Sequence, residues 1–204
     1  MKKNLFISMI ALVSAVLSIS SCQKDDSSVT PAVGNVVTLN ASAYDKWVYF
    51  SFETGAEVTI TDFKNSTDWD IAFHRGDIRV NCGQSGIGQG GSYNAGKVDF
   101  SSVKEAPANG YSLNTTMKIV VSYITNPPTY STEPADTLVS KWLTIIPNTN
   151  AKPTYTFHDY IYVVKTAKGK YAKVWLKDYF NEAGLGGYIT MKYAFQKDGS
   201  RMFE

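Results

Sequence analysis

Short runs of β-branched and aromatic residues, separated by clusters of Gly, Pro, Asn and Asp, fill the chain from Val36 onwards. No stretch carries the apolar stripe of an amphipathic helix, so the pattern predicts strands. In the last run, Ile189, Met191, Tyr193 and Phe195 share one face while Thr190 and Lys192 take the other, which is the period of a half-buried strand. The expected strands span residues 36–39, 47–52, 57–61, 69–75, 78–81, 97–100, 117–124, 142–146, 160–166, 171–179 and 188–196.

These short strands predict an all-β fold, a single domain over residues 35–204 with mostly antiparallel strands in a sandwich or barrel-like arrangement. The segment from Ala167 to Lys170 is typical of a hairpin turn, because Gly169 can take a positive φ. The sequence shows no internal repeat and no second domain boundary. The predicted domain is long enough to bury a proper core.

The N-terminal segment predicts export and lipid attachment. Lys2 and Lys3 precede an apolar run that is too short to span a bilayer, and two small residues then precede Cys22. Residues 1–21 are therefore expected to be a cleaved lipoprotein signal peptide, and Cys22 to become an acylated N-terminal residue that needs no transmembrane helix. Residues 22–34 form a predicted tether.

The acidic pair that follows Cys22 bears on localisation. Asp25 and Asp26 resemble the export signal that places lipoproteins of the Bacteroides and Capnocytophaga group on the outer face of the outer membrane. A solvated linker that begins with charged residues is the alternative. We expect a lipid-anchored outer-membrane protein that faces the cell exterior.

Charge and cysteine content exclude two classes of protein. Without residues 1–21 the chain carries 18 basic and 18 acidic residues, and a neutral chain without a basic stripe is a poor binder of nucleic acid. Cys82 is the one cysteine besides Cys22, so no disulfide framework is expected. Because Cys82 ends an apolar run, we expect a buried thiol rather than a reactive one.

Catalytic and metal sites find little support in the residues. The chain has two histidines, His74 and His158, too few for a zinc site of the usual kind, and neither lies near a nucleophile elbow. His74 is expected to be structural and bonded to Asp70 or Asp77. His158, beside Asp159, could bind a metal, although a structural role is favoured. The chain is therefore not expected to be an enzyme.

The segment from Cys82 to Gly91 contains a literal Gly-x-Gly-x-x-Gly at Gly86, Gly88 and Gly91. A dinucleotide site requires a helix directly after this motif, and another turn-rich stretch follows instead. The segment is therefore expected to be a surface loop with unusual backbone conformations.

The segment Trp-Asp-Ile-Ala-Phe-His-Arg from Trp69 to Arg75, followed by Asn81-Cys82-Gly83, resembles the core of the HmuY family of haem-binding outer-membrane lipoproteins. The likeness continues through Trp142-Leu143 and Gly187-Tyr188 and covers nearly the whole predicted domain. It implies a single all-β domain that acts as a haemophore. Such a protein would capture haem b from host haemoproteins and pass it to a TonB-dependent receptor.

The family resemblance also implies where iron ligands should lie. Family members display histidines or methionines on the loops before and after the Trp-Leu strand, which here are residues 125–134 and 147–153, and neither loop contains His or Met. The candidate haem ligands are therefore Met117, Tyr130 and His158, because methionine, tyrosine and histidine are all known to ligate haem iron. Tyr130 could instead pack on a neighbouring residue.

Two hypotheses from different classes of binding protein follow. The first is a surface lipoprotein that binds haem or another porphyrin in an apolar cleft between the loops around Tyr130 and residues 147–153. The second is a surface module for another ligand, such as a glycan or a partner protein. A hydrolase is a distant third.

Overall fold

A computed structural model describes residues 34–124, 127–148 and 150–203. The predicted signal peptide, Cys22 and nearly all of the predicted tether lie outside the described residues. The described chain is all-β, with no α-helix, which confirms the predicted fold class. Nowhere in the described ranges does a helix reach the length and apolarity that a membrane crossing needs.

The strands and the three short 3-10 turns follow one another along the chain. They are β1 (Asn35–Asn40), β2 (Val48–Ser51), β3 (Ala56–Val58), β4 (Ile71–His74), β5 (Asp77–Val80), η1 (Gly83–Ser85), β6 (Gly91–Gly96), η2 (Phe100–Ser102), β7 (Thr115–Ser122), β8 (Thr129–Ala135), η3 (Val139–Trp142), β9 (Leu143–Ile146), β10 (Thr154–Phe157), β11 (Ile161–Lys165), β12 (Tyr171–Phe180) and β13 (Gly186–Gln196).

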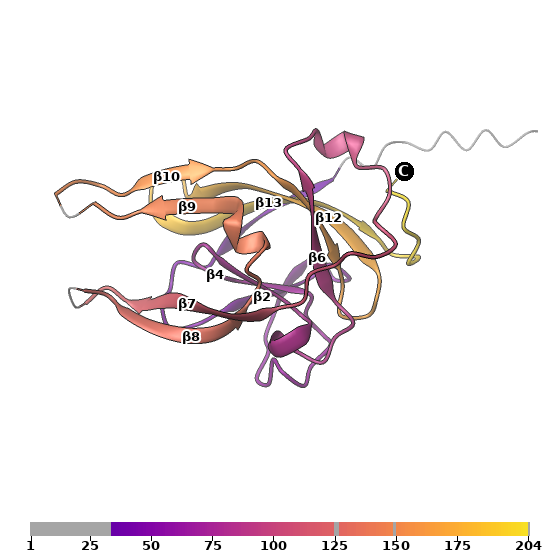
Figure 1. Ribbon diagram of the computed structural model, residues 1–204, viewed down its shortest axis with the longest axis horizontal. Coiled ribbons are helices and arrows are strands. Elements are labelled where there is room, and N and C mark those ends of the chain that lie inside the picture. The colour runs from indigo at the N-terminus through magenta and orange to yellow at the C-terminus, as the bar shows by residue number, and fades with distance from the viewer. Residues whose placement is uncertain (1–33, 125–126, 149, 204) are drawn as a thin grey trace, which may run out of the picture.

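Two antiparallel sheets and two hairpins make up the molecule. One sheet has the order β1-β13-β12-β11-β6, and the other has the order β3-β2-β4-β5. The hairpins β7–β8 and β9–β10 extend together from one end of this body, and the C-terminus lies at the opposite end (Figure 1).

The main core lies between the two sheets. Phe50, Phe73 and Ile78 of the four-stranded sheet belong to the same buried cluster as Val174 and Ile189 of the five-stranded sheet. Along β13 the predicted alternation is confirmed, because its alternate residues from Ile189 to Tyr193 are buried while the residues between them are half-buried. Two apolar faces that bury each other in this way define a sandwich.

Several sequence predictions of strands were wrong. Residues 97–99 are irregular and Phe100–Ser102 is a 3-10 turn, where a strand over 97–100 was expected. Conversely, β6 lies in a stretch interpreted as turns, and β8 lies within an expected loop. Both are edge strands, and an edge strand pairs through its backbone without needing β-branched residues; β8 even contains Pro134, which edge strands tolerate.

A strand over residues 69–75 would place Trp69, Ile71 and Phe73 on one face, but the structure places Trp69 differently. Ile71 and Phe73 enter the main core, but Trp69 lies in a separate cluster with Tyr49 and Ala72. The reason is that β4 begins only at Ile71, so Trp69 precedes the regular strand. Its indole nitrogen donates a hydrogen bond to the Phe63 carbonyl at 2.9 Å.

The glycine-rich segment has the surface exposure that the sequence predicts at Gln84, Ile87 and Gln89, but other parts of it are packed into the domain. Ser85, Gly90 and Gly91 are buried. Gly83, with φ 55°, is the residue of this segment in the left-handed region. At Gly88, an added Cβ would lie 2.5 Å from the Asn81 carbonyl oxygen, so glycine is required there by close packing.

Candidate ligand-binding cleft

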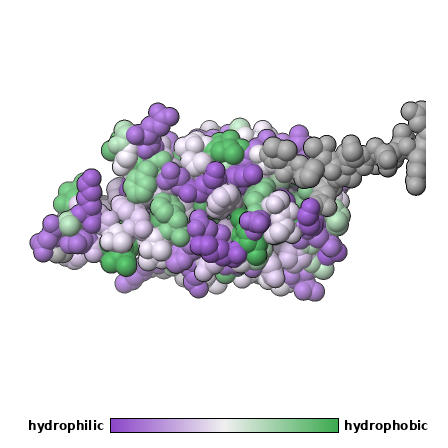
Figure 2. Space-filling view, turned by 90° about the horizontal axis from the view of Figure 1, so that it is seen from above, coloured by the Kyte–Doolittle hydropathy of each residue, from purple (hydrophilic) through white to green (hydrophobic). Residues whose placement is uncertain are grey.

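A cleft of about 770 Å³ lies at the end of the molecule that carries the two hairpins. Residues of β7 and β8 line one side, and β9 and the following residues line another. The β4–β5 turn contributes Arg75 and Gly76, and β5 contributes Asp77. Figure 2 shows separate apolar patches among hydrophilic residues on the face seen there, without one continuous apolar surface. The volume is in the range of small-molecule and cofactor sites.

Tyrosine is the most frequent aromatic residue of the cleft. The tyrosines that line it are Tyr44, Tyr123, Tyr130, Tyr155 and Tyr179. The Tyr44 and Tyr123 rings meet edge to face with centroids 5.2 Å apart, and the Tyr155 and Tyr179 rings are 5.6 Å apart. Aromatic rings of this kind offer flat apolar contact with a polar tip.

Burial controls the protonation of these phenols. It raises the pKa of Tyr179 to about 12 and also raises the pKa of Tyr44 and Tyr123, although the Arg75 charge opposes the shift in each case. All three phenols therefore stay protonated near neutral pH. In the free protein they can therefore donate hydrogen bonds and provide apolar walls.

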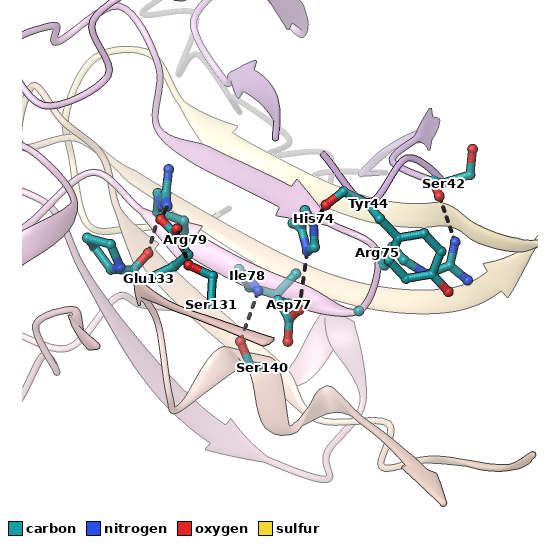
Figure 3. Close-up of polar contacts among 12 residues, drawn as sticks. Ser42, Tyr44, His74, Arg75, Asp77, Ile78, Arg79, Ser131, Glu133 and Ser140 are labelled. Carbon is teal, nitrogen blue, oxygen red and sulfur yellow. Dashed lines mark hydrogen bonds and ion pairs between the residues drawn. The ribbon is translucent and has the colours of Figure 1, made fainter. Parts of the chain in front are cut away.

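Arg75 occupies the β4–β5 turn and is half-buried. Its backbone is in the left-handed region, with φ 52°, which is uncommon for a residue with a side chain. Nη1 donates a hydrogen bond to the Ser42 carbonyl at 2.6 Å, and the guanidinium carbon lies 4.2 Å from the centre of the Tyr44 ring (Figure 3). The guanidinium is thus held in one place by contacts from two sides.

His74 has the structural surroundings that the sequence predicts. Its Nε2 lies 2.9 Å from the Tyr44 carbonyl oxygen and its Nδ1 lies 3.4 Å from Asp77 Oδ2 (Figure 3). Asp70, the other expected partner, instead accepts backbone N–H bonds from Phe52 and Ala167. His74 is buried and is not among the residues that line the cleft.

The structure brings together two of the three candidate ligands. Met117 and Tyr130 both line the cleft. In the hairpin register Met117 pairs with Glu133 and Tyr130 pairs with Val120, so the two candidates belong to opposite faces of the hairpin. They therefore approach the cleft from different sides of one ribbon.

His158 is separate from the other two candidates and does not line the cleft. Its Nε2 lies 2.9 Å from the hydroxyl oxygen of Thr144, which is a lining residue, and its ring stacks on Tyr160 with centroids 5.6 Å apart.

Cys82 is buried and unpaired, as expected for a thiol without a chemical role. Burial raises its pKa to about 12, so the thiolate is scarce near neutral pH. Within the described residues, no group of three or more His, Cys, Asp or Glu side chains is arranged to hold a metal ion.

The sequence reasoning missed Arg75 and the tyrosines that surround it. Arg75 ends the motif that carries the family likeness, but nothing in the sequence indicates that Arg75 and Tyr44 share a cleft. The one signal in the sequence was a charged residue, Arg75, at the end of an expected strand and directly before Gly76.

Comparisons with known proteins agree on one family. The family model described as HmuY protein matches residues 43–193. A Bacteroides vulgatus structure assigned as an HmuY-like haem-binding protein is 28% identical, with a TM-score of 0.64 over 79% of this chain and 91% of that chain. The apo HmuY analogue of Tannerella forsythia is 23% identical, with a TM-score of 0.64 over 80% of this chain and 96% of that chain.

A third structure, of a Bacteroides fragilis protein assigned as a lipoprotein, is 22% identical, with a TM-score of 0.63 over 79% of this chain and 89% of that chain. The two structures with lower identity show the fold alone. None of the curated proteins compared with the chain matches it significantly.

Proposed function

This chain belongs to the HmuY family, and from that premise we propose that it is a non-enzymatic protein that binds haem b or a related porphyrin in the cleft between its two hairpins. The observation that carries the proposal is the cleft itself. It lies beside the Trp142-Leu143 strand, where the family resemblance implies the ligand site, and its tyrosine-rich walls suit a flat apolar ligand.

The residues present fit a haem-like ligand. Met117 offers a thioether and Tyr130 a phenol, and both groups ligate haem iron in proteins. His158 remains the third candidate, but its Nε2 is engaged by Thr144. The iron is therefore not expected to be held by two histidines, because neither histidine lines this cleft and His74 is bonded on both ring nitrogens.

Haem titration followed by visible spectroscopy tests the function and the ligands together. Wild-type protein is expected to shift the Soret band, and alanine replacement of the true ligand should weaken binding by more than about tenfold, which equals about 1.4 kcal/mol. Ligation by Met117 should favour ferrous haem, so that affinity rises with dithionite. Ligation by Tyr130 should favour ferric haem, so that affinity falls on reduction.

The control is Met202→Ala, which removes an exposed methionine outside the cleft. A tight low-spin bis-histidine spectrum of the ferric complex would refute the ligand assignment. Absence of any Soret shift would refute haem binding and would favour the second candidate, a glycan or protein ligand held by the cleft tyrosines without a visible spectral change.

Lipid attachment at Cys22 completes the proposal, supported by the signal-like segment before it. Labelling with a tagged fatty acid should mark the wild-type protein and not Cys22→Ala, whereas Cys82→Ala should label normally because Cys82 is buried in the domain. Label that persists on Cys22→Ala would contradict the assignment.

The same cells test the proposed localisation and partners. Protease added to intact cells should remove a domain displayed on the outer face of the outer membrane, and protection would contradict surface display. Haem captured from a host haemoprotein should support growth through a TonB-dependent receptor, and equal growth without a working TonB system would contradict that route.

A further inference from the structure

Arg75 has hydrogen-bonding capacity that the protein does not use. A guanidinium carries five N–H donors, and the Ser42 carbonyl takes one of them. The Tyr44 ring covers a face of the guanidinium, and the Tyr179 side chain takes a further hydrogen bond from it, with the Tyr179 ring centre 5.7 Å from the guanidinium carbon. Among the ion pairs of the described residues, none joins Arg75 to a carboxylate.

The charge of the cleft favours an anion. Three basic residues line it, Arg75, Lys118 and Lys141, against one acidic residue, Asp77. Asp77 is directed to His74, 3.4 Å away, on the other side of the turn from the Ser42 contact (Figure 3). Lys118 and Lys141 are exposed, so water screens their charges more than that of the half-buried Arg75.

We propose that Arg75 binds a carboxylate of the ligand, and that the cleft therefore selects flat, largely apolar molecules that carry at least one carboxylate. Stacking on Tyr44 occupies a face of the guanidinium and leaves its edge, where a carboxylate binds through paired N–H donors. The left-handed backbone and the Ser42 bond hold this edge in place before the ligand arrives, which limits the entropy lost on binding.

This inference rests on the proposed function, because a porphyrin such as haem carries two propionate groups and so belongs to the selected class. Its dimethyl ester has the same ring and iron but no carboxylate. We call the proposed contact between Arg75 and a ligand carboxylate the carboxylate anchor. Comparing the affinities of the wild-type protein for the two compounds tests this anchor without any substitution. We expect ferric haem to bind at least about tenfold more tightly than its dimethyl ester, a difference of about 1.4 kcal/mol.

The variant Arg75→Gln tests whether Arg75 causes the preference for haem over its dimethyl ester. Glutamine has a side chain, as arginine does, so the backbone cost at φ 52° is retained while the charge is removed. The preference for haem over its ester should fall to near unity in Arg75→Gln, and the matched control Lys118→Gln, an exposed cation of the same cleft, should keep it. Melting temperatures of all three proteins report on folding.

The possible outcomes distinguish failure of the carboxylate anchor from failure of the proposed haem binding. Equal affinity of the wild-type protein for haem and the ester would overturn the anchor and leave haem binding intact. A preference that survives in Arg75→Gln, or equal weakening of both compounds by that substitution, would also overturn it. Absence of a Soret shift with either compound would overturn the proposed function and the anchor together.

Discussion

Replacing Trp142 with alanine is expected to reduce the free energy of unfolding by about 3–5 kcal/mol, the usual cost of truncating a large buried aromatic residue. Trp142 is 1% exposed and packs against Phe157 and Tyr179. Its indole Nε1 also donates a hydrogen bond to the Gly76 carbonyl at 2.9 Å. The substitution therefore leaves a cavity and removes the partner of a half-buried carbonyl.

The same substitution should disturb the cleft, because Trp142 joins two of its parts. Gly76 belongs to the turn that carries Arg75, and Trp142 directly precedes β9, which lines another side. Haem affinity should fall along with stability, even though Trp142 itself does not line the cleft.

Urea unfolding measures the loss of stability in Trp142→Ala, and two further variants serve as comparisons. Trp142→Phe keeps most of the apolar bulk but leaves the Gly76 carbonyl unpaired, so it should cost about 1–3 kcal/mol. Trp175→Ala truncates a half-buried tryptophan that lines a different surface pocket, so it should cost less and leave haem affinity unchanged. Equal stability losses for Trp142→Ala and Trp175→Ala would contradict this account.

The strands of the sandwich were predictable because burial leaves a period in the sequence. β13 shows the alternation from Ile189 to Tyr193, and its neighbour β12 supplies the paired residues Val174 and Leu176. A slip by one residue would move these side chains to the wrong face, so the sequence must keep the pattern.

The strands that were not predicted lack that period for a physical reason. β6 is made largely of Gly, Ser and Asn, and it forms because its backbone completes the edge of the sheet beside β11. β8 and β10 each belong to a two-stranded hairpin with little buried surface, so few of their residues are constrained to be apolar. Whether such a segment forms a strand depends on the backbone of its partner strand, so its own residues do not predict it.

The candidate site was only partly accessible from sequence for a similar reason. Met117 and Tyr130 were chosen for their chemistry, and the hairpin that joins them places both at the cleft. Arg75 could not be found this way, because its fixed position depends on Ser42 and Tyr44, about 30 residues upstream, and on an unusual backbone angle. Contacts between segments that are distant in sequence produce no regular residue spacing from which they could be predicted.

Asn81→Ala is expected to reduce the free energy of unfolding by about 3–5 kcal/mol, because three hydrogen bonds, one buried and two partly buried, depend on one side chain. Asn81 Nδ2 donates to the carbonyls of Ser66 and Trp69, both at 2.9 Å, and its Oδ1 accepts from the Gly88 N–H at 3.0 Å. Asn81 is fully buried, so alanine leaves these three backbone groups without their partner. The matched control is Asn65→Ala, whose exposed side chain bonds only to nearby Asp62 and should change stability by less than about 0.5 kcal/mol.

A second substitution tests whether position 86 must be glycine because it packs against the Asn81 side chain. Gly86 has φ 170°, an extended conformation open to any residue, but an added Cβ would overlap Asn81 Oδ1. Gly86→Ala should therefore be strongly destabilising in the wild-type protein and much less so when Asn81 is already alanine. A double-mutant cycle in urea should give a coupling of more than about 1 kcal/mol. Additive effects would mean that Gly86 serves something other than this contact, and the packing explanation would then fail for the Gly86 position of the motif.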